Sequence, residues 1–181
     1  GPPARVHASS TPVFPETVPV ASLVHYEFPA LDRRPAVTLH WYDGGLLPQR
    51  PEELEPGRKM GDQFGGALYV GTKGKILTGS HGARGARIIP ESKMQEYKRP
   101  PETIPRCPNG HHQEWISACK GQGTTGSNFD FAGPLTEAAL LGNISIRTDE
   151  KLYWDSENFR FTNSEKANEF LHYQYRAGWE L

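Results

Sequence analysis

The chain has 181 residues, a formal net charge of −1 and two cysteines. Lysine and arginine are interleaved with aspartate and glutamate, so no basic stripe indicates binding to nucleic acid or to an anionic membrane. No apolar run approaches the ~20 residues that a membrane span needs, and the residues from Gly1 onward are not expected to form a signal peptide. A chain of this length buries roughly two thirds of its unfolded surface, so we expect a single domain over residues 1–181.

The first half of the chain predicts mainly strands. Alternation of apolar and polar residues predicts strands at 22–28 and 37–42, each covered on one face as in an antiparallel sheet packed on one side. Residues 67–78 read as a hairpin that turns at 72–74, and 86–89 as one more short strand. The residues of the expected covered face include Val24, Tyr26, Phe28, Val37, Leu39 and Trp41.

Helix signals dominate the second half. Asn109 is a candidate N-cap for a helix that runs to residues 119–120, where Gly121 ends it. A second helix is expected over about 134–146, because Pro134 suits the first turn of a helix. Ser164 is a candidate cap of a last helix.

The segments between these helices are expected to be strand-like or irregular. Short strand pieces are expected at 152–154 and 159–161, and the prolines of 90–108 predict a largely irregular segment. Strands followed by helices indicate an α+β fold, with an open, mainly antiparallel β-sheet and helices packed on one face.

The most suggestive chemical group is the pair His111 and His112, followed by Glu114. An imidazole at this position could hydrogen-bond a substrate hydroxyl or move a proton, because histidine titrates near neutral pH. The spacing is not that of a His-Glu-x-x-His metal motif. The alternative is a helix N-terminus with two ordinary polar side chains.

A second candidate is formed by His81 and Arg84, which lie among glycines that would let backbone approach a ligand closely. The alternative is a set of hairpin turns. The spacing Gly-x-Gly-x-x-Gly occurs at 121–126, but it follows a helix rather than a strand, so it indicates a linker and not a dinucleotide site. Cys107 and Cys119 form no metal motif and are expected to be reduced.

Several motifs in order give the chain a family resemblance from about residue 3 to residue 181. It resembles the C-terminal domain of the Gfo/Idh/MocA oxidoreductases, in the bacterial branch of that family. The motifs are 41–45 (WYDGG), 51–54 (PEEL), 70–75 (VGTKGK), 98–101 (KRPP), 111–115 (HHQEW), 127–130 (SNFD), 134–137 (PLTE) and 175–181 (YRAGWEL).

The resemblance implies a two-domain parent that uses NAD or NADP. Its N-terminal Rossmann domain would bind the nicotinamide and carry a Glu-Lys-Pro motif, and its C-terminal domain would supply part of a sugar site and the oligomer interface. Neither Glu-Lys-Pro nor the family's Asp-x-x-x-His occurs in this sequence. We therefore expect no cofactor-binding or catalytic residue in this chain, and we expect those groups in a segment ahead of Gly1.

The sequence thus predicts the substrate-side and oligomerisation domain of an NAD(P)-dependent oxidoreductase that acts on a carbohydrate or polyol. The expected substrate-binding residues are His111, His112, His81 and Arg84, and a homodimer is expected through the sheet face. Two alternatives stay open: a stand-alone sugar-binding or self-association module, and part of an NAD-dependent glycoside hydrolase.

Overall fold

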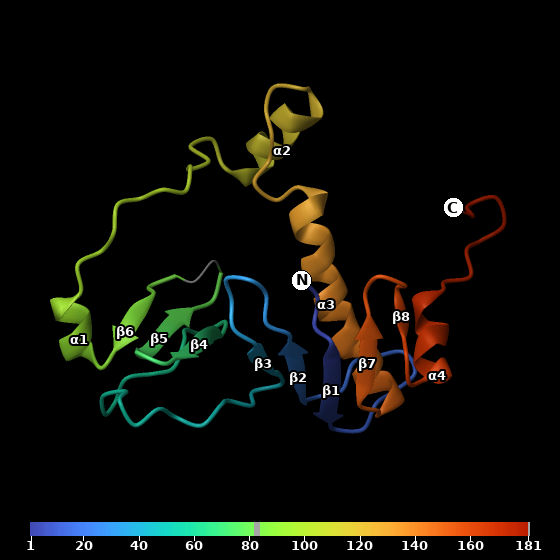
Figure 1. Ribbon diagram of the computed structural model, residues 1–181, viewed down its shortest axis with the longest axis horizontal. Coiled ribbons are helices and arrows are strands. Elements are labelled where there is room, and N and C mark those ends of the chain that lie inside the picture. The colour runs from blue at the N-terminus through green and yellow to red at the C-terminus, as the bar shows by residue number, and fades with distance from the viewer. Residues whose placement is uncertain (82–83, 181) are drawn as a thin grey trace. The chain divides into compact units, whose positions relative to one another are not determined.

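The structure is a computed structural model that describes residues 1–81 and 84–180, with its elements labelled in Figure 1. The chain divides into two compact units. Unit 1 comprises Gly1–Leu47 and Cys107–Leu181, and unit 2 comprises Pro48–Arg106. Each unit has its own sheet, and the single domain expected over residues 1–181 stays a prediction.

Unit 1 contains a five-stranded sheet in the order β3-β2-β1-β7-β8, in which all neighbours are antiparallel. The predicted α+β class is confirmed. The expected succession of strands and then helices holds only in part, because two strands from the end of the chain complete the sheet beside β1 (Figure 1). The strands are β1 Arg5–Ser10, β2 Ser22–Phe28, β3 Val37–Tyr42, β7 Leu152–Asp155 and β8 Arg160–Phe161.

Helix α3, Phe129–Thr148, packs against β1 and β2. It begins at Asn128, whose side chain accepts a hydrogen bond from the backbone N–H of Phe131 at 3.1 Å. The predicted start at Pro134 is wrong: this proline lies inside the helix, because the asparagine caps it earlier in the chain. The helix ends at Asp149, which adopts a left-handed conformation with φ 56°.

The core of unit 1 lies between α3 and the inner face of the sheet. Gly142 of α3 is buried against β2, and a Cβ placed there would overlap the Tyr26 hydroxyl and lie 2.9 Å from the Tyr26 ring carbon that bears it. Only glycine therefore lets helix and strand approach this closely. The buried cluster consists of Val6, Val24, Tyr26, Leu141, Ile144, Leu152, Trp154, Phe161 and Ala167.

Strand β3 is the exposed edge of this sheet. Its apolar residues Val37, Leu39 and Trp41 point to the same side as the core residues of β2 but are 41%, 42% and 58% exposed. The expectation that this strand is covered on one face is therefore wrong within unit 1. The reason is that α3 packs mainly on β1 and β2 and leaves a cavity beside Trp41 of β3.

Unit 2 contains the three-stranded antiparallel sheet β4-β5-β6 and one short helix. The elements are β4 Gly66–Gly71, β5 Gly74–Gly79, β6 Arg87–Ile89 and α1 Glu91–Glu96. The predicted hairpin is confirmed, with Thr72 and Lys73 at its turn. Helix α1 occupies part of the segment 90–108 that was expected to be irregular, because it is short enough to end before the next proline.

The remaining helices belong to unit 1: α2 His111–Cys119, α4 Glu165–Asn168 and the 3₁₀ turn η1 Glu169–Leu171. Ser164 caps α4 as predicted, since its hydroxyl accepts from the N–H of Ala167 at 3.1 Å. Asn109 does not cap α2; Gly110 holds the N-cap position with φ 80°. Among the described residues, no helix combines the length and apolarity needed to cross a membrane.

Candidate functional site

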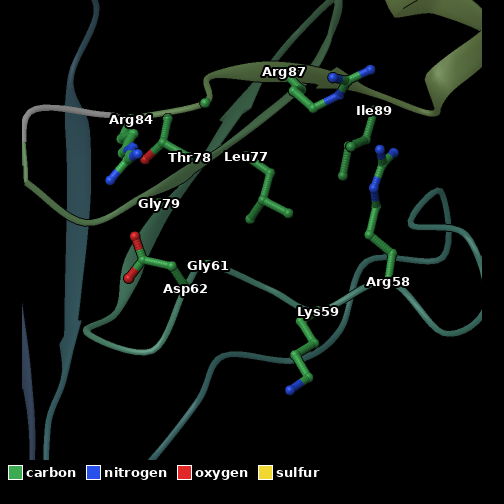
Figure 2. A pocket seen from close by; sticks show the side chains of 11 residues that line it. Arg58, Lys59, Gly61, Asp62, Leu77, Thr78, Gly79, Arg84, Arg87 and Ile89 are labelled. Atoms are coloured by element: carbon green, nitrogen blue, oxygen red, sulfur yellow. The ribbon is translucent and has the colours of Figure 1, made fainter.

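A cavity of about 360 Å³ in unit 2 contains one of the sequence-predicted site residues, Arg84 (Figure 2). Leu77 and Ile89 supply apolar surface from the sheet, and the charged groups come from Arg87 on β6 and from the surrounding loops. We call it the loop cavity. Its lining consists of Arg58, Lys59, Gly61, Asp62, Leu77, Thr78, Gly79, Arg84, Gly85, Arg87 and Ile89.

Asp62 holds two of the lining loops together. Its carboxylate accepts hydrogen bonds from the N–H of Phe64 at 2.8 Å, the N–H of Ser80 at 3.0 Å and the Ser80 hydroxyl at 2.8 Å. These bonds, led by that from Phe64, lower the pKa of Asp62. A Cβ at Gly79 would lie 2.6 Å from the Asp62 carboxylate, so this wall of the cavity requires glycine.

His81 lies beside the cavity and is not part of its lining. Its Nδ1 is 2.8 Å from the Ser80 hydroxyl, and its ring meets Phe64 edge to face at 5.5 Å. The backbone of His81 is left-handed, with φ 49°, a conformation that non-glycine residues hold only where their surroundings stabilise it. The two predicted residues of this loop thus have different positions. Arg84 lines the cavity, and His81 contacts Ser80, which is hydrogen-bonded to Asp62.

Two of the four cationic lining residues are already paired with carboxylates. Arg58 donates to Glu55 at 3.0 Å and to Glu91 at 3.0 Å, and Arg87 Nε donates to Glu91 at 3.1 Å. Hydrogen bonds from Arg87 and then Arg58 lower the pKa of Glu91. Lys59 and Arg84 have no salt bridge among the residues that the structure describes, and Figure 2 shows them on different sides of the cavity.

The second predicted pair, His111 and His112, opens helix α2 in unit 1. Both side chains are exposed, with ring centroids 4.1 Å apart. Glu114, which follows them, accepts from the Cys107 thiol at 2.9 Å, the Thr125 hydroxyl at 3.2 Å and the N–H of Gly126 at 3.2 Å.

Glu114 therefore anchors the loops on both sides of α2. Its pKa is lowered, first by the Cys107 thiol, while the same contact raises the pKa of Cys107. Of His111, His112 and Glu114, only the two histidines have exposed side chains that a ligand can contact. Cys107 and Cys119 are both free thiols, as predicted.

The structure therefore brings His111 next to His112 in unit 1, whereas in unit 2 Arg84 lines the loop cavity and His81 contacts Ser80 and Phe64 outside that lining. Sequence reasoning missed Asp62 and Lys59. The sequence signal for Asp62 was weak, because an aspartate two residues before a Phe-Gly-Gly stretch indicates only a turn. The hydrogen bond between Asp62 and Ser80 forms only when β4 pairs with β5.

The outer face of the five-stranded sheet is a second candidate surface. It is the side turned away from α3, and alternation along the strands places His7, His25 and His40 on it together with both kinds of charge. The salt bridges Arg5–Glu27 at 3.1 Å and Lys151–Glu27 at 3.4 Å lie at one end of this face. Its further members are Leu23, Thr38, Tyr42 and Tyr153.

A smaller cavity of about 150 Å³ lies in unit 1 between α3, β2, β3 and the loop that follows β1. Trp41, Asp43, Asn143 and Arg147 are among its lining residues. Within the described ranges, no group of three or more His, Cys, Asp or Glu side chains is placed to hold a metal ion. Comparison of the chain with family models found no match, and comparison with curated proteins found none either.

Proposed function

We propose that this chain is the substrate-side and self-association region of an NAD(P)-dependent oxidoreductase that acts on a carbohydrate or polyol. The loop cavity is the observation that carries the proposal, because it combines apolar surface with hydrogen-bonding groups of both kinds. A sugar presents C–H faces and hydroxyls that donate and accept. Leu77 and Ile89 suit the C–H faces, Arg84 and Lys59 can donate, and Asp62 can accept.

The predicted histidines fit the same role. His81 keeps one ring nitrogen on Ser80, which leaves the other for a substrate hydroxyl. His111 and His112 are exposed at the first turn of α2, where backbone N–H groups favour an oxygen ligand. In this proposal His81 orients a ligand of the loop cavity in unit 2, His111 and His112 offer separate contacts in unit 1, and none of the three is a catalytic group.

The described residues do not fit a dinucleotide. A Rossmann site needs a parallel βαβ unit with its glycines between strand and helix, whereas every strand pairing in the described ranges is antiparallel. The Gly-x-Gly-x-x-Gly at 121–126 lies between helices α2 and α3. We therefore assign nicotinamide binding to another part of the proposed enzyme and derive no step through the cofactor here.

The outer face is the proposed surface for a second copy of the chain. Antiparallel sheets can face water on one side, so exposure alone does not argue for a partner. The argument is that this face carries Arg5, Lys151 and Glu27 as a cluster of both charge signs at one end, beside the uncharged remainder of β2 and β3. Two copies related by a twofold axis can thus set opposite charges against each other.

The test of the substrate role is calorimetric titration of the chain with a panel of neutral sugars and polyols, with sugar acids as a separate arm. We expect at least one ligand to bind in the micromolar to millimolar range that is usual for substrates, and Arg84→Ala to weaken it at least about tenfold. Arg99→Ala is the matched control, since Arg99 lies in unit 2 but outside the cavity lining. Equal binding by the two variants would contradict the assignment of the cavity.

Titration with NAD(H) and NADP(H) tests the other half of the proposal. We expect no binding below millimolar concentrations. Micromolar affinity of this chain for either nicotinamide would show that the cofactor site had been assigned to the wrong part of the enzyme.

A further inference from the structure

Three histidines form a row across the outer face of the five-stranded sheet, one on each of β1, β2 and β3. Strand register places His7 opposite His25 and His25 opposite His40. The rings of His7 and His25 are stacked with centroids 4.6 Å apart, and those of His25 and His40 meet edge to face at 4.6 Å. We call these three residues the histidine ladder.

The contact between His25 and His40 requires that at least one of the two rings is neutral. The Nδ1 atoms of His25 and His40 are hydrogen-bonded to each other, so one of them must donate and the other must be bare. An imidazolium has a proton on both nitrogens, and therefore two charged rings cannot keep this bond. Nδ1 of His7 is buried and has no hydrogen-bond partner among the described residues, so a proton placed there would lack an acceptor.

The charged neighbours of the ladder do not compensate for protonation. Arg5 on β1 and Lys151 before β7 are cations, and Glu27 on β2 is the one carboxylate near them on these strands. Desolvation is the largest single influence on the pKa of Glu27 and raises it. The hydrogen bonds and positive charges of Arg5 and Lys151 together outweigh this influence, so the pKa of Glu27 is lowered. The other charged groups on this face are Asp155 on β7 and Arg160 on β8, which are register partners of opposite charge at the far edge of the sheet. Tyr42 on β3 and Tyr153 on β7 carry phenol groups, which are ordinarily neutral near pH 7.

Protonation of the ladder therefore changes the charge of the face strongly. Arg5, Lys151 and Glu27 carry one net positive charge, and three imidazolium groups would add three more. Burial of His25, followed by the proximity of His7 and His40, lowers the pKa of His25. His25 thus stays largely neutral at pH 7 and gains its proton only in more acidic solution.

We propose that the histidine ladder is an acid-sensitive switch for self-association through the outer face, so that the neutral ladder accepts a second copy of the chain and the protonated ladder repels it. This inference rests on the proposed function, which assigns that face to a second copy. When two such faces meet, the like charges of both ladders lie at one interface with little solvent to screen them. The face that joins two chains at neutral pH then separates them in acid.

The experiment is sedimentation equilibrium at about pH 8 and about pH 5.5, on either side of the ordinary histidine pKa of about 6.5. We expect the wild-type dimer to dissociate at least about tenfold more readily at the acidic value. In His25→Gln and in His40→Gln this difference should be clearly smaller, because glutamine keeps a polar side chain that does not titrate and each variant removes one of the three titrating rings. His172→Gln is the control, since His172 is exposed, follows η1 and belongs to no strand of the sheet, and it should behave as the wild type.

The outcomes separate the two proposals. A dimer with equal affinity at both pH values overturns the switch and leaves self-association standing, whereas a wild-type chain that is monomeric at both values contradicts self-association itself. Pulsed hydrogen exchange of β2 and β3 verifies that each ladder variant is folded. His40 lies on the exposed edge strand, so the His40→Gln variant should disturb the fold less than His25→Gln. A folded His40→Gln variant with undiminished pH dependence also overturns the switch.

Discussion

Units 1 and 2 are stabilised by different interactions. Unit 1 has a continuous cluster of buried apolar side chains between α3 and its sheet. Unit 2 buries few large side chains, Leu54 and Ile89 among them, and ties its loops with carboxylates that accept several hydrogen bonds each. Apolar burial does not depend on pH, whereas carboxylate bonds do. The proposed substrate cavity therefore lies in the unit that depends more on ionised carboxylates.

The largest expected effect is in the core of unit 1. Phe161 is 1% exposed, and its ring centroid lies 4.9 Å from that of Trp154. Phe161→Ala should therefore lower the free energy of unfolding by about 3–5 kcal/mol. Urea unfolding measures the loss. Phe131→Ala is the matched control, because Phe131 is 64% exposed on α3 and its truncation should change stability little. Equal losses in both variants would contradict the position of the core.

Gly142→Ala tests the close approach of α3 to β2. The added methyl group would overlap the Tyr26 hydroxyl, and such overpacking costs about 1–3 kcal/mol. Gly133→Ala in the same helix is the control, since a Cβ there meets no atom within 4 Å, and it should stabilise the helix by about 0.5–1 kcal/mol. If the two substitutions had the same sign in thermal unfolding, the packing of α3 described here would be wrong.

Glu91→Gln tests the ionic side of the comparison. The Glu91 carboxylate forms salt bridges with Arg58 and Arg87. Loss of its charge should speed amide hydrogen exchange across residues 48–106 and leave exchange in the core of unit 1 unchanged. The effect should be smaller than that of the core variants, because these side chains are partly exposed and screened by salt. Glu96→Gln, in the same helix and without a salt bridge among the described residues, is the control.

The same carboxylates predict different acid responses in the two units. The pKa values of Glu55, Glu91 and Asp62 are lowered in the folded chain, so their stabilisation is complete above the ordinary carboxyl range and is lost as pH falls below it. The lowered pKa of His25 makes protonation unfavourable to folding, so unit 1 should lose stability already as pH falls below about 6.5. Hydrogen exchange measured along a pH series should show strands β2 and β3 responding at higher pH than β5 and β6.

The sequence predicted most of the local structure and little of the long-range pairing. Alternation located β2 and β3, and Ser164 located the start of α4, because these signals act within a few residues. Two predictions based on proline were wrong. Asn128 caps α3, so the helix begins before Pro134, and the short helix α1 fits between two prolines in the segment that was expected to be irregular. The insertion of β7 beside β1 depends on contacts between distant segments, which no local pattern encodes.

The candidate site shows the same division. The composition around His81 and Arg84 indicated the loop that borders the cavity, but the contribution of Asp62 depends on the β4–β5 pairing. Alternation likewise placed His25 on the polar face of its strand. Its two histidine neighbours became visible only when register set His7 and His40 beside it.

The smallest expected effect lies where α3 ends in unit 1. Asp149 is left-handed with φ 56° and places a negative charge at the C-terminus of the helix, and both features are unfavourable for aspartate. Asp149→Gly should therefore raise the free energy of unfolding by about 0.5–1 kcal/mol. Asp149→Asn removes the charge and keeps the side chain, so it should recover only part of the gain. A destabilised glycine variant would mean that the Asp149 side chain makes a contribution to the turn into β7 that outweighs its backbone strain.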